Sequence, residues 1–241
     1  MCSSDLPGHQ VLTHFITQMP LRVSSHRGLG AYANVFSIES FMDELAHLTQ
    51  VDPVAYRLRH LKDPRARDAI TAAASAFGWD TWQRRPGHGR GIAFARYKNI
   101  AGYCAVAMEV VVNPTNGHVR VLRAVASADC GHIVNPDGVS NQIEGGLVQS
   151  LSWTLKEQIH FDEHQVLSTD WASYPILGFG EVPPVEVVLI NRPNAPFLGT
   201  GEASQGPTGA ALANAVFDAT GARMRQIPLT PERVLAALKK A

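Results

Sequence analysis

The chain has 241 residues, 21 Lys plus Arg, 21 Asp plus Glu and a formal net charge of zero at pH 7. Balanced charge gives no long-range field to attract nucleic acid or an anionic membrane, so the composition favours a small-molecule partner. Its 45% hydrophobic content is typical of a globular protein, and no apolar run approaches the roughly 18 residues expected of a transmembrane segment. The three cysteines lie far apart, so this chain alone predicts neither a zinc site nor an iron–sulfur cluster.

The chain start looks unusual. Residues 1–10, MCSSDLPGHQ, lack the basic start and apolar stretch of a signal peptide. We expect these residues to be non-native or disordered, and the chain to be a truncated piece of a longer protein. A helical segment is predicted for residues 11–87 and an α+β segment for 88–241, with the Pro- and Gly-rich residues 86–91 at the boundary.

Three short helices are expected in the helical segment. Ser37 is expected to cap the first of them. Its apolar face is predicted from helical spacing to consist of Phe41, Leu45 and Leu48. The Asp-Pro pairs at 52–53 and 63–64 predict the starts of two more helices, because Asp is a favoured N-cap and Pro a favoured first helical residue. Gly78 is the expected C-cap of the third.

The second segment changes to a period of two. Residues 89–99, 103–113 and 118–129 predict an antiparallel meander. A long helix is expected to start at Asn135 and Pro136, followed by a strand at 185–190. An alanine-rich helix after Glu202 and a terminal helix capped by Thr230 complete the chain. The fold class is therefore predicted as α+β, a mixed and largely antiparallel sheet with packed helices.

The first stretch that could carry chemistry is SSHRGLGAYAN, residues 24–34. Gly28 and Gly30 allow a tight turn that presents backbone N–H groups, and Arg27 brings a forked cation suited to phosphate or carboxylate. The alternative is an ordinary glycine turn with a solvated arginine, leading into a helix.

The second stretch is DCGHIVNPDGVSNQIEGG, residues 129–146. A helix N-terminus leaves N–H groups pointing at whatever lies over it, and Gln142 offers donors and acceptors about two turns further on. Cys130 and His132 have no third and fourth ligand nearby, so they are expected to be a buried thiol and a surface histidine rather than a metal site.

The third stretch is FLGTGEASQGPTG, residues 197–209. One acid, Glu202, stands in a glycine turn just before the alanine-rich helix. A capping or exposed glutamate is the plain interpretation. Four glycines between Gly199 and Gly209 are costly in unfolded-chain entropy, however, and indicate a close backbone approach to a ligand or another segment.

Taken in order, HRGLGAYANVFSIESF, ADCGHIVNPDGVSNQIEGG and GTGEASQGPTGAALANAVFDATG resemble the C-terminal part of the molybdopterin-binding large subunit of the xanthine dehydrogenase and aldehyde oxidase family. The similarity is greatest to the isoquinoline 1-oxidoreductase-like branch. It extends from about residue 11 to the end of the chain.

This resemblance implies a molybdopterin cofactor, with a cytosine dinucleotide as one form, whose metal has no protein side chain as a ligand. Glu202 is implied as the general base. The implied cofactor-binding residues are Arg27, Gly28, Gly30, Gln142, Gly145, Gly146, Gln149, Gly199 and Gly201. The implied reaction is hydroxylation of an aldehyde or an N-heterocycle with oxygen from water, and burial of Glu202 is expected to raise its pKa toward the working pH.

The resemblance also implies partners: a small subunit that carries [2Fe-2S] clusters, and the N-terminal half of the large subunit. The compartment stays open between bacterial periplasm and cytoplasm. Two alternatives stay open as well, a phosphate- or nucleotide-binding module and a non-catalytic interaction domain derived from such an enzyme. The isolated chain is expected to bind little cofactor and to be inactive.

Overall fold

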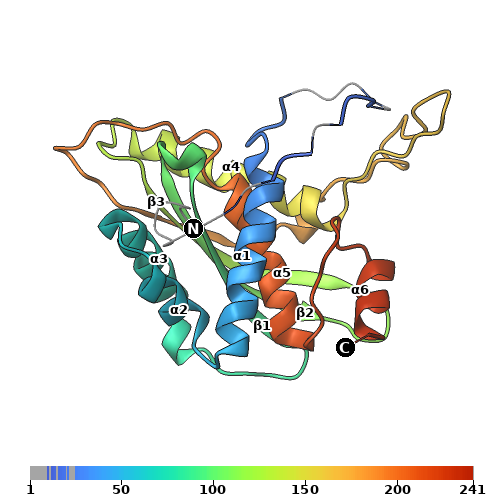
Figure 1. The fold of residues 1–241 in the computed structure, drawn as a ribbon, viewed down its shortest axis with the longest axis horizontal. Coiled ribbons are helices and arrows are strands. Elements are labelled where there is room, and N and C mark those ends of the chain that lie inside the picture. Colours follow the sequence, from blue (N-terminus) through green and yellow to red (C-terminus); the bar gives the residue numbers. More distant parts are fainter. Residues whose placement is uncertain (1–9, 11, 15, 20, 22–24, 241) are drawn as a thin grey trace.

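The computed structural model describes residues 10, 12–14, 16–19, 21 and 25–240 (Figure 1). The expectation for residues 1–10 therefore lies outside the described residues, apart from Gln10. The helices and strands are α1 (Ala31–Leu48), α2 (Pro53–His60), α3 (Pro64–Phe77), β1 (His88–Arg96), β2 (Tyr103–Val112), β3 (Val119–Asp129), α4 (Pro136–Leu155), β4 (Val185–Leu189), α5 (Gln205–Thr220) and α6 (Pro231–Leu238). In the part of the chain covered by these ranges, no helix is both long and apolar enough to cross a membrane.

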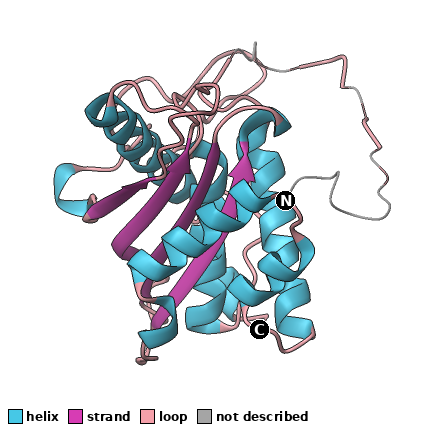
Figure 2. Cartoon of the chain, turned by 90° about the vertical axis from the view of Figure 1, so that its left-hand side faces the viewer, coloured by secondary structure: helices cyan, strands magenta, loops and turns pink. Residues whose placement is uncertain are grey.

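The four strands form one sheet in the order β1-β2-β3-β4. The β1–β2 and β2–β3 pairs are antiparallel, and β4 joins β3 in parallel. Helices lie on both sides of this sheet (Figure 2). The prediction of an α+β fold with a mixed, largely antiparallel sheet is confirmed.

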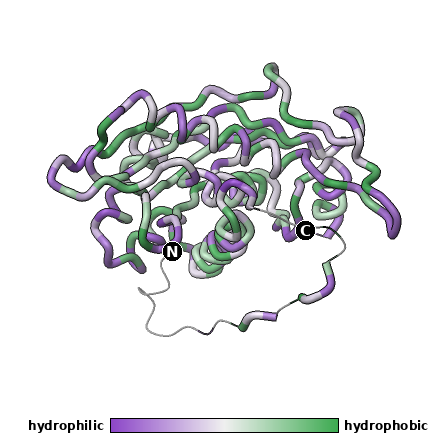
Figure 3. The backbone as a smooth tube through the Cα atoms, turned by 90° about the horizontal axis from the view of Figure 1, so that it is seen from above, coloured by the Kyte–Doolittle hydropathy of each residue, from purple (hydrophilic) through white to green (hydrophobic). Residues whose placement is uncertain are grey.

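The sheet is buried on both faces, and the period of two in the strands assigns side chains to them. Cys104, Val106 and Met108 face a cluster that includes α4 and α5, whereas Ala105 and Ala107 face a cluster with α3. Hydrophobic stretches accordingly run through the middle strands and helices, while hydrophilic stretches are frequent in the outer loops (Figure 3). α3 packs on β2 and β3, and the boundary predicted near residue 87 stays a prediction.

Helix α5 lies directly on β1 because two strand residues have no side chain. A Cβ on Gly91 would come within 2.1 Å of the Ala211 carbonyl oxygen, and one on Gly89 within 2.2 Å of the Ala215 oxygen. Such distances are far below van der Waals contact. Glycine at both positions therefore sets how closely α5 approaches the sheet.

The predicted caps of four helices are confirmed. Each cap side chain accepts a backbone N–H from the first helical turn, which satisfies donors that the helix leaves free. The four residues are Asp52, Asp63, Asn135 and Thr230. Gly78 ends α3 with a left-handed φ of 71°, as expected for a C-cap glycine.

The prediction for α1 was wrong in its start and in its buried face. The helix begins at Ala31, and the Ser37 hydroxyl donates within the helix to the Ala33 carbonyl (3.1 Å). Phe41 and Leu48 are 55% and 76% exposed. The buried face instead contains acidic side chains, among them Glu39.

Ion pairs with arginines explain why acidic side chains lie on the buried face of α1. The Glu39 carboxylate accepts from Arg57 Nε at 2.7 Å, and both side chains are 1% exposed. Asp43 accepts from Arg223 at 2.7 Å. Charged groups can be buried when they are paired and hydrogen-bonded, but the arginines come from other elements. A periodicity that treats every acid as solvent-facing therefore picks the wrong side of α1.

Candidate functional site

Arg27, in the turn before α1, joins the three stretches that the sequence singled out. Its Nε donates to the Gly201 carbonyl (2.5 Å), and its Nη2 donates to the carbonyl (2.9 Å) and side-chain Oε1 (2.8 Å) of Gln142. Its Nη1 donates to Oε1 of Gln149 at 3.3 Å. One guanidinium thus holds the glycine turn of residue 201 against helix α4, using the fork geometry that distinguishes Arg from Lys.

Gly28 connects the same turn to Glu202. The Gly28 N–H donates to Oε1 of Glu202 at 2.9 Å. Its φ is +95°, and a Cβ would lie 2.9 Å from Cβ of Gln205. Both the left-handed backbone and the lack of space require glycine here. The sequence prediction that Gly28 allows close approach and presents its N–H agrees with this geometry.

The pKa of the Glu202 carboxyl is lowered, so the expectation that it is raised toward the working pH was wrong. The Gly28 N–H has the largest lowering effect, followed by the hydroxyl of Tyr97. The partial burial of Glu202 opposes them, and the positive charges of Lys98 and Arg27 lower the pKa further. Hydrogen-bond donors and cations favour the charged form of a carboxyl group and here outweigh its loss of solvation. No sequence signal indicated that Tyr97 and Lys98 lie near Glu202.

Gly145 and Gly146 lie on α4, where it meets the Arg27 side chain. A Cβ on Gly146 would come within 2.3 Å of the Ser204 hydroxyl oxygen, which itself donates to the Ile143 carbonyl at 2.9 Å. Gly146 is therefore needed for contact between α4 and the start of α5. A Cβ on Gly145 would meet only Arg27, at 4.0 Å.

The remaining predicted glycines face more open space. A Cβ on Gly199 would meet no atom within 4 Å, and one on Gly201 would meet only Gln142, at 3.9 Å. Gly30 is the N-cap residue of α1, and a Cβ there would meet only Asn34, at 3.5 Å. Gly199 and Gly201 leave room beside Glu202, whereas Gly30 makes no contact with Arg27 or Glu202 that distinguishes it as part of the site.

Gln205 belongs to this cluster, although the sequence pattern did not single it out. The residue is fully buried, and its Nε2 donates to Oε1 of Gln149 at 3.0 Å. Its Oε1 has no hydrogen-bond partner among the described residues. An unpaired buried acceptor is costly, so a ligand that brings an N–H or O–H donor fits here. A glutamine in the first turn of an alanine-rich helix gives no sequence signal of burial.

Over residues 10–240, with the gaps given above, no group of three or more His, Cys, Asp or Glu side chains is arranged to hold a metal ion. Cys130 is buried and His132 is exposed. His160 and His164 have a spacing that metal sites use, but they lie on an exposed hairpin whose Asp162 accepts backbone N–H groups. The donors that the described residues bring near Glu202 are amides, the Arg27 guanidinium, the Tyr97 hydroxyl and the Lys98 ammonium group. This set suits a cofactor that carries its own metal ligands.

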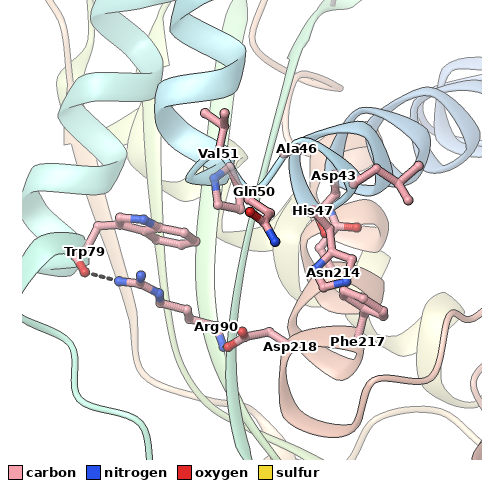
Figure 4. A pocket seen from close by; sticks show the side chains of 12 residues that line it. Asp43, Ala46, His47, Gln50, Val51, Trp79, Arg90, Asn214, Phe217 and Asp218 are labelled. Carbon is pink, nitrogen blue, oxygen red and sulfur yellow. Dashed lines mark hydrogen bonds between the residues drawn. The ribbon is translucent and has the colours of Figure 1, made fainter. Parts of the chain in front are cut away.

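A separate cavity of about 540 Å³ lies at the other end of α1 and α5 (Figure 4). The guanidinium carbon of Arg90 lies 4.1 Å from the centroid of the Trp79 ring, and the guanidinium donates to the Trp79 carbonyl. His47 and Phe217 make an edge-to-face contact at 5.0 Å on another wall. Glu202 lies just before the N-terminus of α5, whereas this cavity adjoins its C-terminal turns.

Comparison with known proteins identifies the family of this chain. A sequence profile described as a molybdopterin cofactor-binding domain matches residues 31–183. The chain belongs to this family. The resemblance to the molybdopterin-binding subunits of the xanthine dehydrogenase and aldehyde oxidase family is confirmed.

Two curated relatives are similar over most of the chain. A nicotinate dehydrogenase polypeptide of Pseudomonas putida is 44% identical over 90% of this chain and 20% of its own length. The beta polypeptide of isoquinoline 1-oxidoreductase from Brevundimonas diminuta is 31% identical over 89% of this chain and 27% of its own length. The chain therefore spans about a fifth to a quarter of these relatives.

Solved structures show the same fold. The quinoline 2-oxidoreductase of Pseudomonas putida 86 superposes with a TM-score of 0.81 at 14% identity, over 90% of this chain and 53% of that one. The aldehyde oxidoreductase of Desulfovibrio gigas superposes with a TM-score of 0.77 at 17% identity, over 89% of this chain and 42% of that one.

Proposed function

We propose that this chain provides the glutamate-bearing wall of the active site of a molybdenum hydroxylase, with Glu202 as the general base. The observation that carries the proposal is the junction at Arg27 and Gly28. There, three segments that are far apart in the sequence converge on one carboxylate, and Gly28 donates to it at 2.9 Å. Gly28, which donates to that carboxylate, has φ +95° and no room for a Cβ.

The residues present fit a molybdopterin cofactor. Arg27, Gln142 and Gln149 supply polar groups beside the space left by the glycines, and the unpaired Oε1 of Gln205 offers an acceptor. When bound, the cofactor supplies the two-electron redox chemistry. The cytosine dinucleotide form and a separate [2Fe-2S] subunit are part of the proposal.

The carboxylate of Glu202 is prepared to accept a proton. The Gly28 N–H holds its Oε1, and no hydrogen bond of standard geometry from a residue with a described position reaches its Oε2. Because its pKa is lowered, the group is ionised throughout the neutral range. A carboxylate with a lowered pKa is a weaker base than one with a pKa near 7. In almost every protein molecule, however, it is ionised and able to accept a proton.

An N-heteroaromatic substrate is favoured over an aldehyde. The support comes from the relatives, whose names refer to nicotinate, isoquinoline and nicotine, at 44%, 31% and 32% identity. The relative named as the molybdenum-binding part of an aldehyde oxidoreductase of Escherichia coli is 31% identical over only 54% of the chain.

The test is the substitution Glu202→Gln in the complete enzyme. Gln keeps the size of the side chain and removes its basicity, so turnover should fall by roughly 10²–10⁴-fold, the usual contribution of a general base, with molybdenum content unchanged. Glu163→Gln on the exposed hairpin is the matched control and should retain turnover. If Glu202→Gln keeps wild-type turnover, the base is elsewhere, and the phosphate-binding or interaction alternatives become the better interpretation.

A further inference from the structure

The hairpin tip between β1 and β2 lies against the Glu202 turn. The tip contains the short 3₁₀ helix Tyr97–Asn99. A Cβ on Gly102 would lie 3.1 Å from the Gly199 carbonyl oxygen and 3.8 Å from Cβ of Ala203. The two turns are therefore in direct contact, so side chains of the tip reach the surroundings of Glu202.

The backbone of this tip is left-handed at two consecutive residues. Lys98 and Asn99 both have left-handed φ values, 52° and 60°. Positive φ at two consecutive positions also occurs in type I′ hairpin turns, where Asn is favoured.

Tyr97 stands directly before these two residues. The residue is 8% exposed, and its hydroxyl has no hydrogen bond of standard geometry to any described residue. Lys98 Nζ lies 5.3 Å from the centroid of the Tyr97 ring. A buried hydroxyl without a partner is unfavourable. The segment that the tip contacts is the turn that carries Glu202, and the charge of the Glu202 carboxylate acts on the Tyr97 hydroxyl.

We propose that Tyr97 is a positioning residue for Glu202: its hydroxyl donates to the carboxylate opposite Gly28, and Lys98 adds a positive charge that keeps the carboxylate ionised. This inference rests on the proposed role of Glu202 as the base. Among the described residues, the charged or titratable groups that act on Glu202 are Arg27 from the turn before α1, and Tyr97 and Lys98 from the hairpin tip.

Tyr97 and Glu202 shift each other's pKa in the directions expected of a donor and an acceptor. Burial, and after it the Glu202 carboxylate, raises the pKa of Tyr97 to about 12, so its hydroxyl keeps its proton and remains a donor. In turn the hydroxyl lowers the pKa of Glu202, more strongly than Lys98 does. Removing the Tyr97 hydroxyl should therefore raise the pKa of Glu202, and removing the Lys98 charge should raise it less.

The test is a titration of the Glu202 side-chain carboxyl by ¹³C NMR in the 241-residue chain, with the resonance assigned by its loss in Glu202→Gln. Tyr97→Phe removes one oxygen and keeps the ring. It should move the midpoint to higher pH, and Lys98→Gln should move it less far in the same direction. Tyr174→Phe is the matched control, because that hydroxyl donates to a different acid, Glu157, at 2.6 Å. It should leave the Glu202 midpoint unchanged.

An unchanged midpoint in Tyr97→Phe overturns the proposal, and so does an equal displacement in Tyr174→Phe. In the complete enzyme, Tyr97→Phe should move the acid limb of kcat/KM to higher pH by the displacement seen in the titration. A wild-type rate in Glu202→Gln, together with an intact titration effect, would instead reject the base and leave the Tyr97 contact standing.

Discussion

Asp129, at the end of β3, is a fully buried carboxylate that is used for structure rather than chemistry. It accepts from Arg65 and Arg192, each at 2.5 Å, and from the Gly131 N–H at 3.0 Å. Burial by itself raises the pKa of Asp129, but hydrogen bonds from the two arginines and Gly131 outweigh burial and lower it. Glu202 likewise accepts a backbone N–H, from Gly28, whereas the nearby Arg27 donates to Gly201 and Gln142 instead of to Glu202. The difference is that Asp129 has no open space beside it.

Replacing this carboxylate should change how stability depends on pH. Because the folded pKa of Asp129 is lowered, its contribution is complete above the unfolded value of about 4 and is lost as the pH falls through the folded value. Asp129→Asn should cost about 2 kcal/mol of unfolding free energy at about pH 7. Its stability should also fall less than that of wild type as the pH drops from about 5 to about 2. Urea unfolding across this range measures both effects.

The control for this substitution is the exposed Asp80→Asn. It should follow the wild-type stability curve at every pH, because a surface substitution away from special features changes stability by about 0.5 kcal/mol or less. If Asp129→Asn instead runs parallel to wild type over the whole acid range, the ion pairs with Arg65 and Arg192 do not stabilise the fold.

At the scale of elements, glycine spacing decides how α1, α5 and β1 stack. The sequence pattern attributed the glycines between 199 and 209 to close backbone approach. In the structure that reason holds for two of them. A Cβ on Gly206 would lie 2.9 Å from Val35, and one on Gly209 would lie 3.0 Å from Tyr32, both on α1. Gly199 and Gly201 instead leave open space, so one glycine-rich run serves helix packing and the site.

The contact of α5 with β1 can be tested with Gly91→Ala. The added methyl group would meet backbone atoms of α5 at 2.1 Å and 2.3 Å, which cannot move without shifting the whole helix. We expect a loss of about 3 kcal/mol in unfolding free energy, measured by denaturant unfolding. Gly180→Ala is the matched control, since no atom lies within 4 Å of its Cβ position. Equal stability of the two variants would show that α5 does not press on β1 as described.

For the whole molecule, the site lies where α1, α4 and α5 begin or meet, and one side of it is open. Gly199 and Gly201 are exposed, and Arg27 is partly exposed. The chain spans 20% and 27% of the two curated relatives described above. We therefore propose that this wall offers donors to one side of a cofactor and that other protein segments contact the rest.

We expect the isolated 241-residue chain to hold much less than one molybdenum per molecule and to show no hydroxylase turnover. The reason is that a large polar cofactor contacted on one side keeps most of its surface in water, so little binding free energy is gained. Metal analysis of the purified chain by mass spectrometry measures this. Stoichiometric molybdenum that survives gel filtration would show that this wall alone is sufficient.

Local sequence signals were enough to predict most of the helices and strands. Caps such as Asp52 and Asn135, the meander and the alanine-rich helix follow from residues within a few positions of one another, and the three motifs in order indicated the family. Three properties could be read only from the folded chain: which face of α1 is buried, that Tyr97 and Lys98 adjoin Glu202, and that the pKa of Glu202 is lowered. They depend on partners from distant segments, because the charge state of a carboxyl group is set by the donors around it, which spacing along the chain does not reveal.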